Sequence, residues 1–340
     1  MNRARNRAGG YLMTALMACS ISAVWADERA HFDPQQHERT QQLVDELVAE
    51  GLPEEWLTET FNQAAFSQGV LDAMEGAAER RLRWYEYRDI FMTQQRIDEG
   101  AAFIDEYADT LARAEEVYGV PREVITAIIG VETYYGRHKG QHRVLDSLAT
   151  LAFHHPVRGD FFRGELAAFL KIAYEQGVEP TELYGSYAGA MGYPQFIPTS
   201  YQAYAVDFDD DGIRDLWENP VDAIGSVANY FAVHGWQRDS AIYHEANGPD
   251  IPPESLTFNQ TSAPTVTVSA VREAGIEPQH VLDPTLPVVP LMLELSDDSV
   301  RYRLGEYNFY VITRYNHSHL YAMAVAELSE AIEQQVEGER

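Results

Sequence analysis

Cysteine and basic residues are scarce in this sequence. Cys19 is the only cysteine among 340 residues, so an intrachain disulfide is excluded. Lysine occurs only as Lys139 and Lys171, and 25 basic residues face 53 acidic ones, which gives a formal net charge of −28. A charge of this sign and size argues against a nucleic-acid partner and for a strongly hydrated surface.

The first 26 residues differ from the rest of the chain. Three arginines precede an apolar run, which is the layout of a secretory signal. Small Ala26 suits ordinary cleavage, whereas the "LMAC" that ends at Cys19 resembles a lipobox whose cysteine would carry a lipid. We favour soluble secretion, because the residues after Cys19 stay apolar. Both outcomes place the mature chain in the periplasm, either soluble or as an outer-membrane lipoprotein anchored through Cys19.

Hydrophobic periodicity, glycine and proline divide the remaining chain. Helical patterns extend to about residue 236 and are broken at residues such as Gly51 and Gly119. From about 247 to 310 the apolar period falls to two. Predicted strands are "TVTVS", "LMLEL", "VRYRL" and "YNFYVITR", with "SDDS" as a hairpin turn between the second and third. We therefore predict a mainly α protein of the α+β class.

The predicted boundaries follow from this pattern. A signal peptide at 1–26 precedes an α-helical domain at 27–118, to which an amphipathic C-terminal helix at 317–340 is expected to return. Residues 119–245 form a second helical block, and residues 246–316 form a small β domain.

The segment "DFDDDGIRDLWE", residues 207–218, fits the twelve-residue EF-hand calcium loop. Gly212 permits the sharp turn in its middle, and oxygen donors fall at the spacing that wraps a calcium ion. The predicted ligands are Asp207, Asp209, Asp211, Ile213 through its carbonyl, Asp215 through a water, and Glu218. A single loop favours a structural Ca²⁺ over a sensor, a solvated acidic turn is the alternative, and no organic cofactor is expected.

The segment "SYAGAMGYPQF", residues 186–196, combines small residues, aromatic rings and the amide of Gln195. Aromatic rings stack on the apolar faces of sugars, and an amide can donate to and accept from their hydroxyls. A tightly packed turn would use the same small residues. The pattern therefore leaves a sugar-binding wall and a packed core both open.

Glu132 falls where a core residue is expected. In "VITAIIGVETYYG", residues 124–136, it lies four residues after Ile128 and three after Ile129, on the apolar stripe of a helix. Burial and the negative end of the helix dipole both raise the pKa of a carboxyl group in this place. Glu132 would then be protonated near neutral pH and able to act as a general acid. Without further support, an ion-paired or solvated carboxylate is the commoner case.

Five segments occur in a distinctive order: "IIGVETYYG", "SYAGAMGYPQF", "AVDFDDDG", "DAIGSVANYFAVHGW" and "YNFYVITRYNHSHLYAMAV". Together they resemble the lytic murein transglycosylase B family of bacterial peptidoglycan-cleaving enzymes, over about residues 30–335. The resemblance implies a lysozyme-like α core, a flanking α domain, a small β domain and an EF-hand-like calcium site. It implies cleavage of the β-1,4 bond between N-acetylmuramic acid and N-acetylglucosamine without water, leaving a 1,6-anhydromuramoyl end.

The resemblance also assigns roles to residues. The glutamate of "VET", Glu132, would be the catalytic acid. Binding residues would be Tyr87, Ser186, Gln195, Tyr230, Tyr315, Asn316 and Tyr321. Relatives often carry two adjacent arginines where this chain has Val157 and Arg158, so Arg158 alone is expected to hold the peptide more weakly. Peptidoglycan strands are the expected partner of a monomer, with other cell-wall enzymes as further candidates in wall turnover.

Most glycosidases pair their acid with a second carboxylate. The matching motifs supply none, which suits a mechanism in which Glu132 first donates a proton and then accepts one from the muramic C6 hydroxyl as it attacks C1. Asp146 and Asp160 remain candidates for a second acid.

Two other functions also remain open. A lysozyme-type hydrolase would give a product one water heavier, and a noncatalytic wall-binding scaffold would release no fragments.

A basic run follows the helix of Glu132. The segment "GRHKGQHR", residues 136–143, contains Arg137, Lys139 and Arg143 in a chain where bases are rare. It would either meet the carboxylates of peptidoglycan stem peptides or form a solvated loop.

Overall fold

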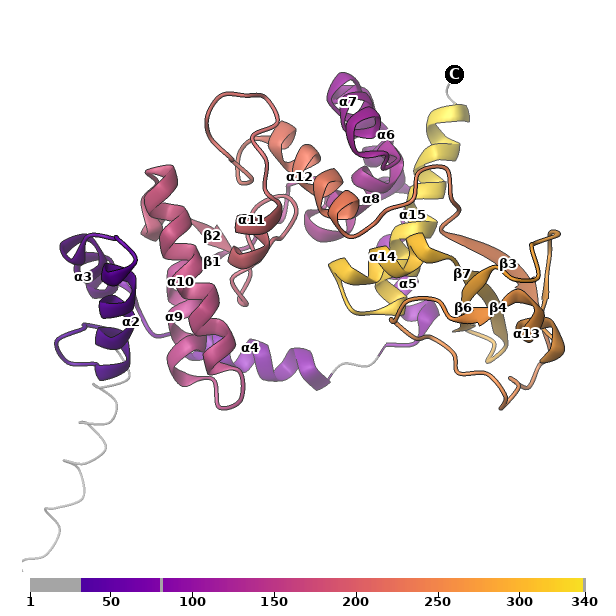
Figure 1. Cartoon of the computed structure of the whole chain (residues 1–340), viewed down its shortest axis with the longest axis horizontal. Helices are drawn as coiled ribbons and strands as arrows, with labels where there is room; N and C mark the ends of the chain where they lie inside the picture. Colours follow the sequence, from indigo (N-terminus) through magenta and orange to yellow (C-terminus); the bar gives the residue numbers. More distant parts are fainter. Residues whose placement is uncertain (1–31, 80–81, 339–340) are drawn as a thin grey trace, which may run out of the picture. The chain divides into compact units, whose positions relative to one another are not determined.

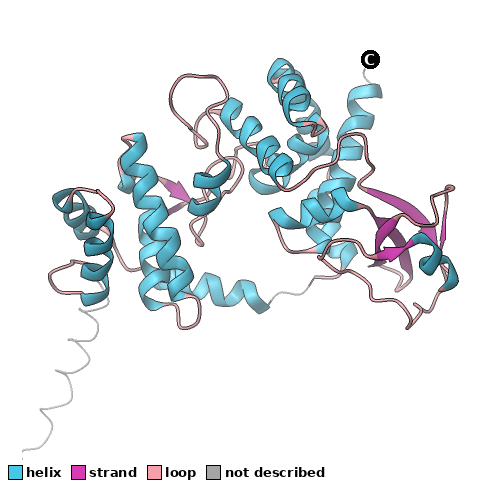
Figure 2. Cartoon of the chain, viewed as in Figure 1, coloured by secondary structure: helices cyan, strands magenta, loops and turns pink. Residues whose placement is uncertain are grey.

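The computed structural model describes residues 32–79 and 82–338. The predicted signal peptide and Cys19 lie outside them. The chain divides into two compact units between Phe66 and Ser67. Helices dominate the described residues, and most of the strands gather in one region late in the chain (Figure 1, Figure 2). None of the described helices combines the length and apolar content that crossing a lipid bilayer requires.

The first unit contains α2 (Glu38–Ala49) and α3 (Glu54–Gln63), which pack against each other. The ring Nδ1 of His37 accepts the backbone N–H of Thr40 at 3.2 Å and so caps α2. The apolar faces of the two helices supply Leu43, Leu47, Leu57 and Phe61, all fully buried or nearly so.

The second unit is built around α8 (Arg122–Thr133), whose residues from Val124 to Gly130 are all buried. This helix packs against α6, α7, α12 and α15 because its apolar residues cover most of its circumference. The other helices before the sheet are α4 (Gln68–Glu79), α5 (Trp84–Phe91), α6 (Gln94–Glu106), α7 (Ala108–Tyr118), α9 (Val144–His154), α10 (Gly159–Gln176), the 3₁₀ turn η1 (Pro180–Glu182), α11 (Pro198–Tyr204) and α12 (Pro220–Val233).

Two antiparallel sheets belong to the described residues of this unit. Strands β1 (His142–Arg143) and β2 (Tyr184–Gly185) form a small pair. The larger sheet has the order β4-β6-β7-β3-β5, and its inner face packs on a cluster that includes Val268, Val271 and Leu304. Its strands are β3 (Tyr243–Asn247), β4 (Val266–Thr267), β5 (Glu277–Pro278), β6 (Pro287–Glu294) and β7 (Val300–Gly305). The predicted hairpin around "SDDS" is confirmed, because β6 and β7 pair across it.

Two predicted strands are wrong wholly or in part. The segment "YNFYVITR" forms the helix α14 (Tyr307–Tyr315), followed by α15 (His319–Gly338). Its β-branched and aromatic residues favour a strand locally, but Asn308, Phe309, Val311 and Ile312 are buried at helical spacing. In "TVTVS", only two residues join the sheet, because Thr267 accepts the N–H of Ala270 and starts α13 (Val268–Glu273).

A buried carboxylate fixes the start of α11. Glu165 of α10 is only 3% exposed. Its Oε2 accepts the backbone N–H of Thr199 at 2.9 Å, and its Oε1 accepts the Thr199 hydroxyl at 2.7 Å. The carboxylate thereby satisfies N-terminal groups of α11 that would otherwise be left without partners.

Glu165→Ala should lower the free energy of unfolding of the second unit by about 2 kcal/mol, because it leaves buried donors of α11 without an acceptor. Glu175→Ala is the matched control: Glu175 lies on the same helix, is 56% exposed and makes only a 3.8 Å ion pair with Arg214. Its loss should cost no more than about 0.5 kcal/mol. Equal effects in urea unfolding of the two variants would contradict the capping role.

Candidate active site

Glu132 occupies the last turn of α8. The residue keeps part of its surface accessible, while protein atoms enclose its carboxyl group. The hydroxyl of Tyr321 donates a hydrogen bond of 2.6 Å to Oε1. Burial raises the pKa of this carboxyl from an ordinary 4.5 to about 7, and the Tyr321 hydrogen bond opposes part of the rise. The group is therefore protonated in a large share of molecules at neutral pH.

Three tyrosines from three helices converge on this carboxyl. Tyr87 lies on α5, Tyr315 ends α14 and Tyr321 lies in the first turns of α15. Burial raises the pKa of each phenol, and the charge of Glu132 raises it further; the pKa of Tyr87 reaches about 12. Of the three, Tyr321 contacts the carboxyl directly through its hydroxyl. The rings of Tyr315 and Tyr321 are nearly parallel, with an interplanar angle of 9° and centroids 6.3 Å apart.

Tyr230 packs against Tyr315, one of these three tyrosines. It is 7% exposed, and its hydroxyl donates to the carbonyl of Arg314 at 2.6 Å. Its ring centroid lies 4.8 Å from that of Tyr315. The structure thus places Tyr230 among the predicted site residues, as a packing partner of Tyr315.

The chain turns sharply after Glu132. Tyr134 and Tyr135 both adopt the left-handed conformation, with φ of 53° and 57°, which ends α8. The Thr133 hydroxyl lies 3.0 Å from the carbonyl of Tyr193 and ties the helix end to the segment 186–196. Consecutive non-glycine residues in this conformation are costly and concentrate at functional sites.

The segment 186–196 is a packed turn. The Ser186 hydroxyl accepts the N–H groups of Ala188 and Ala190, at 3.2 and 3.0 Å. Gly192, with φ of 68°, lies so close to Leu216 that a Cβ would sit 2.1 Å from its carbonyl oxygen. Close packing, one of the two alternatives for this pattern, therefore accounts for the small residues here.

Gln195 belongs to the same turn. Its backbone has φ of 50°, and its amide nitrogen donates to the carbonyls of Gly192 at 2.9 Å and Lys139 at 3.2 Å. This use of the nitrogen leaves the amide oxygen as the atom that could meet a ligand.

Two predicted binding residues lie at the surface. Asn316 is exposed directly after Tyr315. Arg158 is exposed at the turn between α9 and α10, where its guanidinium lies 4.6 Å from the ring centroid of Phe161. The contacts of Arg158 keep it on this turn, so the structure does not join it to the group around Glu132.

Within residues 32–79 and 82–338, no other carboxylate contributes to the raised pKa of Glu132, which burial raises and the Tyr321 hydrogen bond lowers. Asp146 lies 3.2 Å from Arg143 in an ion pair, and Asp160 is exposed in the first turn of α10. The arrangement provides one carboxyl able to move a proton.

The acidic loop 207–218 gathers three of the predicted ligands. Asp207, Asp209 and Asp211 each offer an oxygen, and these oxygens lie within 4.8 Å of one another. Hard carboxylate oxygens at this separation fit a calcium ion, and Gly212 takes the predicted turn with φ of 93°. Ile213 is exposed, and Asp215 accepts the N–H groups of Trp217 and Glu218 through Oδ1.

Sequence patterns missed Asp222, which organises this loop. It is fully buried in the first turn of α12, and its oxygens accept the N–H groups of Phe208 at 2.7 Å and Asp215 at 2.8 Å. Burial, the largest cause, raises its pKa to about 6, although both hydrogen bonds lower it. An aspartate two residues after Pro220, in the first turn that Asn219-Pro220 begins, was the available signal.

The basic run 136–143 is neutralised within the chain. Arg137 pairs with Glu99 at 2.8 Å, Lys139 with Glu218 at 3.1 Å and Arg143 with Asp146 at 3.2 Å. Lys139 thus holds the last predicted ligand of the acidic loop. The solvated-loop alternative fits this run better than a site for peptide carboxylates.

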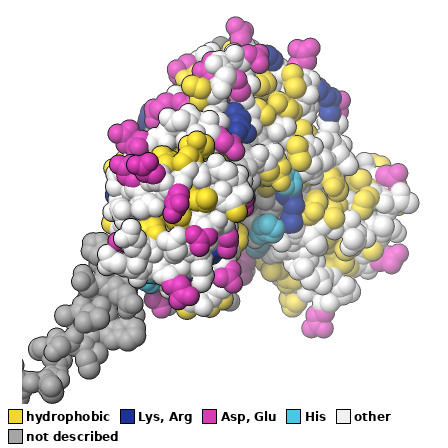
Figure 3. Space-filling model, turned by 60° about the vertical axis from the view of Figure 1, so that its left-hand side comes forward, with side chains coloured by type: hydrophobic (Ala, Val, Ile, Leu, Met, Phe, Trp, Pro, Cys, Tyr) yellow, Lys and Arg dark blue, Asp and Glu magenta, His cyan; other side chains and the backbone are white. Residues whose placement is uncertain are grey.

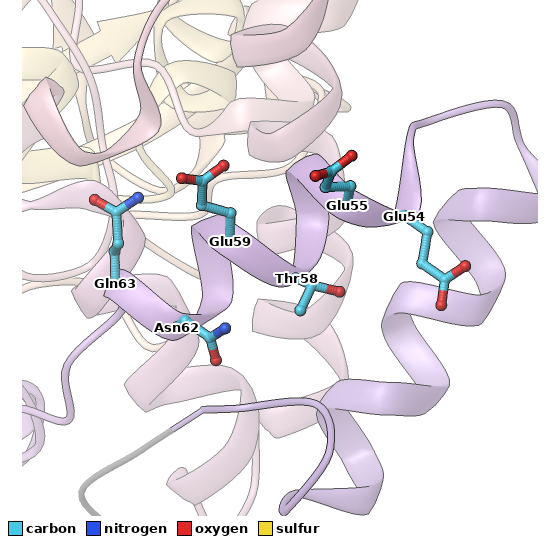
Figure 4. Close-up of a pocket in the computed structure, with 6 residues that line it drawn as sticks. All are labelled: Glu54, Glu55, Thr58, Glu59, Asn62 and Gln63. Atoms are coloured by element: carbon cyan, nitrogen blue, oxygen red, sulfur yellow. The ribbon is translucent and has the colours of Figure 1, made fainter.

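The surface elsewhere reflects the charge of the chain. Acidic side chains are spread over the face shown in Figure 3 and outnumber basic ones there. A hollow in the first unit is lined by Glu54, Glu55, Thr58, Glu59, Asn62 and Gln63. Figure 4 shows that all six project from one helix, α3, so the hollow is an open acidic helix face without converging groups.

Comparison with known proteins decides the family. The Transglycosylase SLT domain family matches residues 35–330. The chain belongs to this family. It is 43% identical over 304 residues to the membrane-bound lytic murein transglycosylase B of Escherichia coli (strain K12), covering 86% of this chain and 82% of that protein. It is therefore a peptidoglycan lytic transglycosylase, and enzymes of this class cleave the polymer without hydrolysis.

Solved structures of lytic transglycosylases share the fold, which confirms the predicted lysozyme-like, mainly α class. The soluble lytic transglycosylase SltB1 from Pseudomonas aeruginosa aligns with a TM-score of 0.82 at 44% identity, covering 87% of this chain and 98% of that one. The Escherichia coli lytic transglycosylase Slt35 in complex with calcium aligns with a TM-score of 0.80 at 43% identity, covering 87% and 93%.

Glu132→Gln should stabilise the lytic transglycosylase at pH 8 but not at pH 4. A carboxyl whose folded pKa is raised imposes no penalty below its unfolded pKa, and the penalty grows as pH rises from 4.5 to about 7. The gain at pH 8 should therefore be about 2 to 3 kcal/mol. Glu116→Gln, on an exposed position of α7, is the control and should leave the pH dependence of Tm unchanged. Parallel Tm curves for Glu132→Gln and wild type would refute the buried neutral acid.

Proposed function

We propose that Glu132 is the catalytic acid of this lytic transglycosylase and then its base. The observation that supports the proposal is the enclosed carboxyl with a pKa of about 7, reached by three tyrosines and by no second carboxylate in the described chain. A group with this pKa can give a proton to the glycosidic oxygen at neutral pH and can take one back.

The second half of the reaction follows from the lone carboxylate. Once ionised, Glu132 accepts the proton of the muramic C6 hydroxyl while that oxygen bonds to C1, which closes the 1,6-anhydro ring. The Tyr321 hydroxyl, 2.6 Å from Oε1, stabilises the ionised form between the two proton transfers. A lysozyme-type hydrolase is the alternative, and it would need water at C1 instead.

The remaining residues form the substrate wall in this proposal. Tyr87 and Tyr315 offer ring faces and edges to the sugars, and the amide oxygen of Gln195 receives a sugar hydroxyl or N–H. Tyr321, which is 2% exposed, takes part through the hydrogen bond that it donates to Glu132. Ser186 keeps its hydroxyl hydrogen as a donor while its oxygen holds the turn. Asn316 extends the wall at its exposed end, and Arg158 is assigned to stem-peptide contacts outside it.

We also propose that loop 207–218 is an EF-hand-like site for a structural Ca²⁺. Asp207, Asp209 and Asp211 would hold the ion with the carbonyl of Ile213, with Asp215 through a water and with Glu218 released from Lys139. The calcium complex of Slt35 supports this assignment. The ion would neutralise carboxylates that repel one another and so stabilise the loop.

The location and assembly of the chain complete the proposal. Peptidoglycan lies outside the cytoplasmic membrane, which supports export through the predicted signal at 1–26 and action in the periplasm. The chain is proposed to act as a monomer on glycan strands, alongside other cell-wall enzymes. A lipid on Cys19 remains the alternative to a cleaved, soluble form.

Wild-type enzyme should release muropeptides with 1,6-anhydro ends from purified sacculi, one water lighter than reducing-end products. Glu132→Gln should lower the rate at least about 10³-fold, because the amide can neither donate nor accept the proton. Mass spectrometry of the released products measures both. Reducing ends would establish the hydrolase instead, and an active Glu132→Gln variant would remove Glu132 from the mechanism.

Calcium should raise Tm in proportion to the logarithm of its concentration. Asp207→Asn, which removes a ligand charge, should weaken calcium binding by about 10-fold or more in titration calorimetry. Asp210→Asn is the matched control, since Asp210 lies in the same loop but at no ligand position and has φ of 61°, which asparagine tolerates. Identical calcium responses in wild type and Asp207→Asn would exclude the site.

A further inference from the structure

A charged cluster lies where α15 meets α5 and the larger sheet. Glu327 of α15 is 8% exposed, and its Oε2 lies 2.5 Å from Nε of Arg88 on α5. One turn further along α15, Glu330 accepts the hydroxyl of Tyr243 on β3 at 2.7 Å. The two glutamates thus connect one helix to two different neighbours.

The Arg88–Glu327 pair is not explained by packing. Every residue of α15 from Tyr321 to Ser329 is buried, and a leucine or alanine would fill the position of Glu327 without removing a charge from water. The Arg88 side chain is 37% exposed, so water still solvates part of the pair, and a pair that keeps such solvation adds little to stability. A pair with this geometry therefore gives orientation more than stability.

The orientation concerns Tyr87, the neighbour of Arg88. The hydroxyls of Tyr230, Tyr315 and Tyr321 each donate a hydrogen bond that fixes the ring. For Tyr87, the described residues provide a ring contact with Phe91 of the same helix, 5.2 Å between centroids, and no hydroxyl partner. The position of Tyr87, whose phenol senses the charge of Glu132, thus depends on where α5 lies.

Contacts at both ends of α5 set its position. It has eight residues and packs on α15 and β6 (Figure 1). Trp84 buries its first turn, and Arg83 reaches Asp298, whose side chain is 87% exposed. Beyond the first turn, Arg96 of α6 donates to the carbonyl of Ile90 at 3.3 Å, and its guanidinium lies 5.1 Å from the ring centroid of Phe91. Arg88, whose side chain is 37% exposed, adds a second polar link to α5, and its buried partner Glu327 lies six residues after Tyr321 on α15. The Arg88–Glu327 pair therefore links the helix that carries Tyr87 to the helix that carries Tyr321.

We propose that Glu327 is a positioning residue of the reaction, which through Arg88 holds α5 so that Tyr87 covers the carboxyl of Glu132. The proposal rests on the assigned roles of Glu132 and Tyr87. Without the pair, only Arg96 holds the second turn of α5 by a polar contact, so the turn shifts, water reaches the carboxyl and Tyr87 covers it less well.

Glu327→Gln tests the proposal. It keeps the shape but removes the charge that holds Arg88, so kcat/KM on soluble peptidoglycan strands at pH 7 should fall about 10-fold. The pKa of Glu132 should fall below about 7 toward its ordinary 4.5, because hydration favours the ionised form. Carboxyl ¹³C NMR of glutamate-labelled protein, assigned with Glu132→Gln, follows that pKa directly.

Glu330→Gln is the matched control, since Glu330 lies one turn away on the same helix and bonds to β3 instead of α5. It should leave the Glu132 titration in place and kcat/KM within about twofold. The double variant Arg88→Gln/Glu327→Gln should lose no more activity than the single, because both residues act through one contact. Arg88→Lys, which keeps a charge beside Glu327, should give a smaller loss in the same direction and covers the case of a poorly folding Glu327→Gln.

Two results would overturn the proposal. Glu327→Gln could keep the Glu132 titration and kcat/KM of wild type, or Glu330→Gln could lose both to the same extent, which would mark a general loss of stability. Failure of the catalytic role of Glu132 can be distinguished from failure of this proposal, because it would show as an active Glu132→Gln variant, independently of the Glu327 variants.

Discussion

The removal of one carboxyl group from water is the constraint on which the site depends. Glu132 lies in a helix whose preceding residues are almost entirely apolar, and three helices contributed by distant parts of the chain bring tyrosines to it. Each ring excludes water from the carboxyl, and each phenol stays neutral because the same burial raises its pKa. The acid and its enclosure are therefore one arrangement, and the fold must bring α5, α8, α14 and α15 together to make it.

The turns around the carboxyl are held by buried polar groups. Thr133 ties the end of α8 to the segment 186–196, and the amide of Gln195 reaches back to the loop at Lys139. Glu165 and Asp222 each bind two backbone or hydroxyl donors from short elements that could not form alone. These two buried carboxylates therefore stabilise the fold, whereas Glu132 is placed to move a proton.

Local sequence signals predicted much of this architecture. The helix of Glu132, the hairpin around "SDDS" and the C-terminal helix all follow from periodicity and turn residues, and the ordered motifs predicted the family. The prediction of a strand at 307–314 was wrong, because burial at helical spacing overrides the strand preference of its residues. Contacts that join distant segments, such as Arg88 with Glu327, leave no mark in any local pattern. The acidic partners of the basic run, Glu99 and Glu218, could not be predicted from a local pattern either, and they neutralise this cationic segment.

The contact at Gly192 restricts the sequence changes that the chain can accept during evolution. The carbonyl of Leu216 lies where a side chain of residue 192 would be, and the N–H of Tyr193 donates to that same carbonyl at 2.9 Å. The backbones of the acidic loop and of the turn that carries Gln195 are therefore in direct contact, and only glycine fits at position 192. An insertion or deletion in one segment would displace the other, so the lengths of the two segments can change only together.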